Sequence, residues 1–159
     1  MRHYTYYVPM AELDPALACT CFKLRSLARR VTSLYDEVLA GAGITVTQYA
    51  VLTVLVAARR TKEAIGVTEL ARRLQADRTT LRRGLDLLLD AGLIAIERQG
   101  ESGDARVKTV AVTPAGARRW RAAEPLWRKA QARMDHHLGG PLHGALRKHL
   151  DRSSEAIGA

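Results

Sequence analysis

The sequence predicts a mainly α-helical protein that carries one short β-hairpin. Two observations support this fold class. Apolar residues recur at steps of three and four over most of the chain, which is typical of helices with one buried face. After Gly92 the pattern changes to β-branched residues in partial alternation, which is typical of short strands. We therefore expect a helical protein with a single two-stranded hairpin in its second half.

The first predicted helix is long. Asp14-Pro15 is typical of an N-cap followed by the first helical residue. An apolar stripe about seven turns long then ends at the glycines of residues 40–43. Its members are Leu17, Cys21, Leu24, Leu27, Val31, Leu34 and Val38. A small core cannot cover a stripe of this length, so we expect an extended partner along it, such as a second copy of the chain.

Two shorter helices should follow. Thr45 and Gln48 have the spacing of a capping box, in which each side chain bonds the backbone N–H of the other residue. One face of this helix carries Tyr49, Leu52, Leu55 and Val56. After the polar connection of residues 59–66, Thr68 is predicted to cap a short helix over 69–76.

The next helix has two different faces. Asp77 is placed to cap it, and Gly92 ends it. Its apolar face consists of Leu81, Leu85, Leu88 and Leu89. Its other face carries Arg78, Thr79, Thr80, Arg82 and Arg83 in the first turns. A soluble helix needs no such concentration of arginine and hydroxyl groups at its N-terminus, so this face indicates a binding function.

Residues 93–99 and 106–113 are predicted strands, and residues 100–105 between them have turn composition. Thr113-Pro114 should then cap a long helix that reaches Leu138, in which Pro125 predicts a kink or a break. Gly139-Gly140-Pro141 should end that helix and begin a last one that reaches residue 157.

A short helix, a tight connection, an arginine-rich helix and a hairpin form, in this order, a winged helix-turn-helix. The DNA major groove admits one α-helix, whose N-terminal residues meet the base edges, and arginine pairs with guanine through two bonds. On the hairpin, Arg106 is predicted to enter the minor groove. We expect Asp104 to hold Arg106 in position and Lys108 to lie behind it. The net charge of +9 agrees with a polyanionic partner.

Residues 14–157 resemble the MarR family of bacterial transcription regulators. The segments that carry the resemblance are GITVTQYAVLTVL, GVTELARRLQADRTTLRRGLDLLLDAGLI and GESGDARVKTVAVTPAG. The last is similar to the family's wing pattern, although Val112 replaces a leucine and Pro114 follows the threonine. The resemblance implies an obligate homodimer, built by the first and last helices, that binds pseudo-palindromic double-stranded DNA. It also implies a small aromatic or lipophilic effector, bound between the dimerisation and DNA-binding regions.

Residues 14–44 and 114–157 are the expected dimerisation region, and 45–113 the expected winged helix-turn-helix domain. The candidate DNA-binding residues are Thr68, Arg78, Thr79, Thr80, Arg82, Arg83, Asp104, Arg106 and Lys108. Of the five on the arginine-rich helix, we expect about three to read bases and the others to hold phosphates. Arg118, Arg119 and Arg121 are interpreted as a solvated face.

The function we predict is that of a sequence-specific transcriptional regulator, a repressor rather than an activator. The alternative is an architectural protein that coats nucleic acid without specificity, which would share the charge but would not need a shaped reading helix. An enzyme is not expected, because the sequence has no phosphate-cradling glycine loop, no His-Glu metal motif and no nucleophile elbow. It has no apolar run of membrane-spanning or signal-peptide length, so we expect a cytoplasmic protein without a membrane partner.

Cys19 and Cys21 leave three interpretations open. We place them one to two turns inside the first helix, where side chains two residues apart diverge by about 200° and do not pair readily. They are then small buried apolar residues, the interpretation we favour, or a thiol redox switch. The third interpretation is a metal or iron–sulfur cluster shared across the dimer, because two copies supply four thiolates.

The histidines and tryptophans of the C-terminal region are further candidates. His136, His137, His143 and His149 lie on both sides of the predicted helix break. We interpret them as helix-end charges and caps rather than as a second site. Trp120 and Trp127 lie seven residues apart on one helix face. They should pack in the core or interface, or line a cavity for an aromatic effector.

Overall fold

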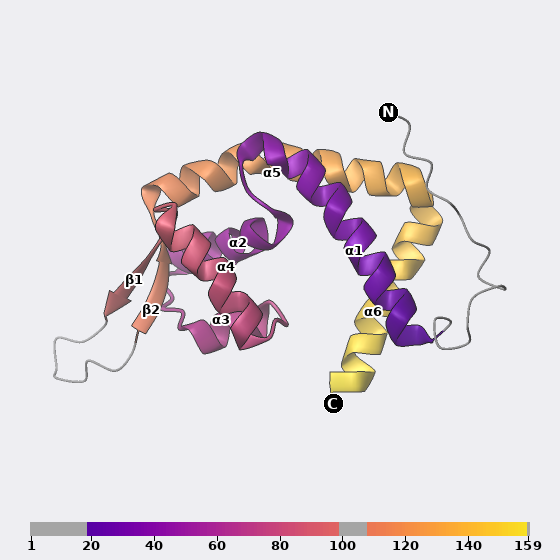
Figure 1. The fold of residues 1–159 in the computed structure, drawn as a ribbon, viewed down its shortest axis with the longest axis horizontal. Coiled ribbons are helices and arrows are strands. Elements are labelled where there is room, and N and C mark those ends of the chain that lie inside the picture. Colours follow the sequence, from indigo (N-terminus) through magenta and orange to yellow (C-terminus); the bar gives the residue numbers. More distant parts are fainter. Residues whose placement is uncertain (1–18, 99–107, 159) are drawn as a thin grey trace. The chain divides into compact units, whose positions relative to one another are not determined.

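The computed structural model describes residues 19–98 and 108–158, and it confirms a mainly helical fold with one two-stranded hairpin (Figure 1). The elements are α1 (Thr20–Leu39), a 3₁₀ turn (Ala40–Ala42), α2 (Val46–Thr61), α3 (Val67–Arg73), α4 (Arg78–Asp90), β1 (Ile94–Arg98), β2 (Lys108–Val112), α5 (Pro114–Leu138) and α6 (Gly140–Gly158). The chain divides into two compact units after Leu34. The first unit contains the start of α1, and the second contains the end of α1, from Tyr35, and all later elements. The predicted domain boundaries at 44/45 and 113/114 stay predictions.

The core of the second unit lies where α2, α3, α4 and the hairpin meet. Its fully buried side chains include Leu52 and Leu55 on α2, Leu70 on α3 and Leu88 on α4, together with Ile65 in the connection before α3. Each comes from the apolar face of its element. This core holds α4 with its opposite face outward.

Three predicted helix caps are confirmed. The Thr45 hydroxyl accepts from the backbone N–H of Gln48, whose side chain accepts from the N–H of Thr45. The carboxylate of Asp77 accepts from the N–H of Thr79 at 2.9 Å. Thr113 caps α5 by accepting from the N–H of Gly116, with Pro114 at the first helical position.

The predicted cap at Thr68 is wrong, because α3 begins one residue before it. Gly66 is the N-cap, and Thr68 is the exposed second residue of the helix. The cause is a tertiary contact. The N–H of Val110 on β2 donates to the carbonyl of Ile65 at 2.8 Å, and Gly66 forms a bridge with Thr109. The connection before α3 is thus held against the hairpin, and the helix starts where this pairing ends.

The strands β1 and β2 are antiparallel, with Ile94 opposite Val112 and Arg98 opposite Lys108. This confirms the predicted hairpin. The predicted turn at its tip, with Asp104 and Arg106, lies outside the described residues.

α5 is continuous from Pro114 to Leu138, so the predicted break at Pro125 does not occur. Proline removes one helical hydrogen bond, here the bond to the carbonyl of Arg121. Both Pro125 and Arg121 are exposed, so water can satisfy that carbonyl. The predicted end at Gly139 is confirmed, with a φ of 72° at this residue.

The start of α5 is joined tightly to the start of the hairpin. The Thr113 hydroxyl donates to the carbonyl oxygen of Gly92 at 2.8 Å and to that of Leu93 at 3.1 Å. A Cβ atom added at Gly116 would lie 1.9 Å from the Leu93 carbonyl oxygen. Only glycine therefore permits this close approach of α5 to the hairpin.

Gln75, in the turn between α3 and α4, has a φ of 49°, a left-handed conformation that side chains other than glycine rarely adopt. We expect Gln75→Gly to raise the free energy of unfolding by about 0.5–1 kcal/mol, because it removes this backbone strain. Urea denaturation measures the change. The matched control is Gln131→Gly inside α5, which should lower stability by about 1 kcal/mol. Equal losses in both variants would contradict the strain at Gln75.

Within residues 19–98 and 108–158, no single helix has the length and apolar character needed to cross a membrane. Thr20–Ala42 and Val46–Thr61 pass the length and composition test for a membrane span only as a bent pair, taken together. This is weak evidence for a span, because core helices of soluble proteins pass the same test.

Candidate nucleic-acid interface

α4 presents the two faces that its sequence predicts. Leu81, Leu85 and Leu88 are buried, and Leu89 is half-buried. Thr79, Arg82 and Arg83 are exposed on the other side. Arg78 and Thr80 belong to the first turn of the same helix. The N-terminus of α4 therefore offers hydroxyl and guanidinium groups to a partner, together with the positive end of the helix dipole.

Three exposed cations of this surface have no acidic partner among the described residues. Arg82 and Arg83 on α4 and Lys108 on β2 form no ion pair with any residue that the structure describes. An unpaired surface cation can bind a phosphate or a base edge without first giving up an internal partner.

The arginines of α3 are different. Glu69 binds Arg72 through two bonds of 2.7 and 2.8 Å and also binds Arg73, which reaches Glu63 as well. Hydrogen bonds from Arg72 and Arg73 lower the pKa of Glu69 to about 2. Because this pKa is lowered, the contribution of these pairs to stability is present above the ordinary value near 4.5 and is lost as the pH falls toward 2. The charges of α3 are thus neutralised within the protein.

A groove of about 320 Å³ separates α4 from the hairpin and brings two of the predicted DNA-binding residues together. Arg82 and Lys108 both line it, with Asp86 and a mainly apolar floor that includes Leu85 and Ile96. Thr68 does not line this groove. Asp104 and Arg106 lie outside the described residues, so their predicted roles stay predictions.

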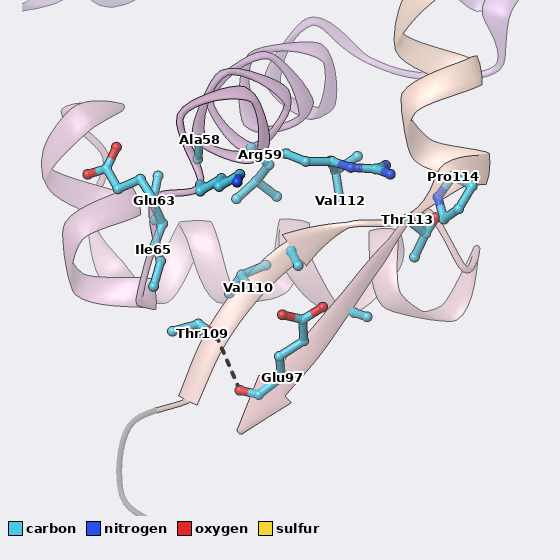
Figure 2. Close-up of a pocket in the computed structure, with 15 residues that line it drawn as sticks. Ala58, Arg59, Glu63, Ile65, Glu97, Thr109, Val110, Val112, Thr113 and Pro114 are labelled. Atoms are coloured by element: carbon cyan, nitrogen blue, oxygen red, sulfur yellow. Dashed lines mark hydrogen bonds between the residues drawn. The ribbon is translucent and has the colours of Figure 1, made fainter. Parts of the chain in front are cut away.

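A second, more open pocket of about 560 Å³ lies on the other side of the hairpin, toward the end of α2 (Figure 2). Figure 2 shows Arg59 along the α2 side and the carboxylate of Glu97 on the hairpin side. Leu55 and Ile65 form its floor but are already covered, so the pocket offers little apolar surface to a ligand. Sequence reasoning did not identify this pocket, because its walls come from three separate segments.

The predicted packing of Trp120 and Trp127 is confirmed. The Tyr49 ring stacks on both indoles, with its centroid 6.5 Å from that of Trp120 and 6.0 Å from that of Trp127. The Trp120 indole N–H also donates to the Thr53 hydroxyl at 2.9 Å. Burial is the main cause that raises the pKa of Tyr49. These contacts join α2 to α5. The predicted effector cavity at this level stays a prediction.

One histidine and one arginine have partners that the sequence did not predict. His143 is buried, and its Nδ1 atom lies 2.5 Å from a carboxylate oxygen of Asp135. Arg119 is exposed as predicted, but it also donates to the carbonyl of Ala42 at 2.8 Å and so contacts the connection after α1. Arg118 and Arg121 are exposed, as predicted.

Cys19 and Cys21 differ from our expectation in two respects. Cys19 is not one to two turns inside a helix: α1 begins at Thr20, and the Cys19 sulfur accepts from the N–H of Phe22 at 3.4 Å, in the manner of a cap. Both cysteines are also exposed in this chain, so they are not packed in its core. Among the described residues, no group of three or more His, Cys, Asp or Glu side chains could hold a metal ion.

The sequence matches no family model and no curated protein. Among solved structures, the transcriptional regulator MosR of M. tuberculosis in complex with DNA is 31% identical, with a TM-score of 0.70, and the match covers 87% of this chain and 98% of that one. A second structure of MosR is 29% identical, with the same TM-score, and the match covers 87% of this chain and 96% of that one. MarR from E. coli shares the fold, with a TM-score of 0.63 and 22% identity. The match covers 85% of this chain and 96% of that one.

These proteins are transcription regulators and not enzymes. The match to MosR, at 31% identity, extends over most of this chain and nearly the whole of the other. The chain therefore belongs to the MarR family of winged helix-turn-helix transcriptional regulators.

Proposed function

We propose that this protein is a homodimeric, sequence-specific DNA-binding repressor. The observation that carries the proposal is the exposed face of α4. Arg82 and Arg83 have no acidic partner within residues 19–98 and 108–158, while the arginines of α3 are neutralised by Glu63 and Glu69. In this proposal, α4 enters the major groove and Lys108 at the base of the hairpin holds a phosphate. MosR, MepR and CouR, with the same fold, have been solved bound to DNA, which supports DNA as the partner.

The remaining predicted residues are assigned to the same surface. Thr79, Arg78 and Thr80 join Arg82 and Arg83 in base and phosphate contacts at the start of α4. We propose a phosphate contact for Thr68, which is exposed at the start of α3. We propose that Arg106 enters the minor groove, held by Asp104.

Apolar residues at the two ends of the chain support a dimer. α6 exposes Leu142, Leu150 and Ile157, the last to 82% of its accessible surface. α1 exposes Leu24 and Leu27. Large apolar side chains that recur along a helix and remain exposed in one chain indicate an interface. In our proposal α1 and α6 pair with their copies, and the two α4 helices read half-sites about one helical turn apart.

A binding titration tests the proposal against the architectural alternative. We expect the protein to bind DNA from its own operon at physiological salt far more tightly than random DNA of equal length, and to protect one short palindrome in a footprint. Sedimentation should give the mass of a dimer. Equal affinity for both DNAs would favour the architectural protein and reject a specific regulator.

For the signal, we propose a small effector or the redox or metal state of Cys19 and Cys21. CouR has been solved with p-coumaroyl-CoA, which supports a small-molecule ligand in this fold. The exposure of both thiols, and the position of Cys19 at the N-terminus of α1, support redox chemistry.

An absorbance spectrum of protein purified without oxygen tests for a metal or an iron–sulfur cluster. A Cys19→Ser, Cys21→Ser double variant should bind DNA independently of peroxide and reductant. A colourless, metal-free wild type whose DNA binding ignores both reagents would exclude any role of these cysteines in sensing.

A further inference from the structure

We infer that the pair of His143 and Asp135 is a positioning device that sets the direction in which α6 leaves α5, and through it the spacing of the two DNA half-sites. The inference rests on the proposed dimeric DNA-binding function. It concerns the corner formed by Asp135 in the last turn of α5, Gly139 and His143 in the first turn of α6.

Backbone and side-chain bonds both close this corner. The N–H of Gly139 donates to the carbonyl of Asp135 at 2.8 Å, and the N–H of His143 donates to the carbonyl of Gly139 at 3.0 Å. The imidazole then reaches back to the Asp135 carboxylate at 2.5 Å. The side-chain pair thus adds a constraint between the two helices that the backbone bonds at a single glycine do not supply.

The burial of His143 makes this contact hard to exchange for water. His143 is 8% exposed, whereas the Asp135 side chain is 59% exposed. A buried ring N–H that loses its acceptor carries a desolvation cost that water does not offset, so the bonded arrangement is favoured. The carboxylate also lies near the N-terminus of α6, where the helix dipole favours a negative charge, although it is unfavourable at the C-terminus of α5. One arrangement of the corner is therefore preferred.

Two further groups face the corner. Tyr35, on α1, is buried, and its pKa is raised by burial and by the negative charge of Asp135, while the positive charge of Arg147 on α6 opposes the rise. Asp135 and Arg147 thus both lie close enough to Tyr35 to act on it, with opposite effects on its pKa. The end of α1, the end of α5 and the start of α6 are coupled through these side chains.

A small change at the corner has a large effect at the end of α6. A helix of 19 residues is about 28 Å long, so each 10° of rotation moves its far end by about 5 Å. Successive base pairs are about 3.4 Å apart. If α6 pairs with its copy, a loose corner changes the separation of the two α4 helices by more than one base pair. A dimer that reads a fixed spacing needs a rigid corner.

Spin labels measure the corner directly and without DNA. We would attach them at Lys129→Cys on α5 and Ser153→Cys on α6, both exposed, in a Cys19→Ser, Cys21→Ser background. We expect a narrow distance distribution in the otherwise native chain and a broadened or shifted one in Asp135→Ala. Asp135→Asn, which keeps an acceptor, should remain narrow. Asp151→Ala removes one exposed carboxylate from α6 and is the matched control. Equal distributions in all four proteins would overturn the inference.

Operators whose spacer is lengthened or shortened by one base pair test the consequence. Wild-type protein should prefer its own spacing by about tenfold, and Asp135→Ala should reduce this preference to within about threefold while it remains a dimer. Because Asp135 is largely exposed, we expect Asp135→Ala to fold. His143→Phe is a second variant, in which an apolar ring fills the space of the imidazole. Full spacing preference in both variants would overturn the inference. Failure of the wild type to bind any operator would instead reject the proposed function, and the spin labels would still test the corner.

Discussion

Replacing Arg83 by alanine should weaken binding to the preferred DNA site by about 1–3 kcal/mol and relax the sequence preference at one base pair. Arg83 is exposed near the start of α4 and has no acidic partner among the described residues, so its guanidinium is available for two bonds to a guanine. Titrations of single-base variants of the operator, at one salt concentration, measure both effects.

Two matched variants separate base reading from charge. Arg72→Ala removes an arginine that is also exposed but already bound to Glu69, so it should leave DNA affinity nearly unchanged. Lys108→Ala should weaken binding to all sequences about equally and reduce the slope of log affinity against log salt by about one. Loss of specificity in Lys108→Ala alone would show that this division of roles is wrong.

Gly116→Ala should lower the free energy of unfolding by at least about 3 kcal/mol. The added methyl group would lie 1.9 Å from the carbonyl oxygen of Leu93, and a backbone atom cannot rotate away as the end of a side chain can. Either α5 or the start of the hairpin must then move, and the bonds of the Thr113 hydroxyl there would be lost. Urea denaturation followed by circular dichroism measures the loss.

Gly84→Ala is the control for this glycine. Gly84 also lies within a helix, but apart from the backbone of that helix no described atom lies within 4 Å of the position of an added Cβ. This variant should gain about 0.5–1 kcal/mol from the better helix propensity of alanine. The same unfolding midpoint for Gly116→Ala and the wild type would mean that the contact with Leu93 does not constrain the joint.

The features predicted correctly from the sequence are those that depend on local spacing. The caps at Thr45, Asp77 and Thr113 require only a side-chain oxygen two or three residues before a backbone N–H. The two faces of α4 follow from a period of 3.6 residues. The hairpin follows from strand composition on both sides of a turn.

The errors arose where a distant segment decides the local structure. Thr68 looked like a cap, but β2 pairs with Ile65 and Gly66, so the helix begins earlier. The partners of His143 and Arg119 are eight and 77 residues away along the chain, and no periodicity reports such pairs. The contrast between the neutralised arginines of α3 and Arg82 and Arg83 of α4, which have no ion pair among the described residues, also needed side-chain geometry.

The joint at Thr113 has a consequence for how such a regulator can change during evolution. The hairpin leaves the core at Ile94 and returns to it at Val112, directly opposite, and Thr113 ties the return to Gly92 and Leu93. Residues inserted or deleted between the strands therefore leave the anchoring of α4 and α5 unchanged. The length and chemistry of the wing can vary while the reading helix keeps its place. The hairpin tip and α4 can thus change in sequence independently, as modules.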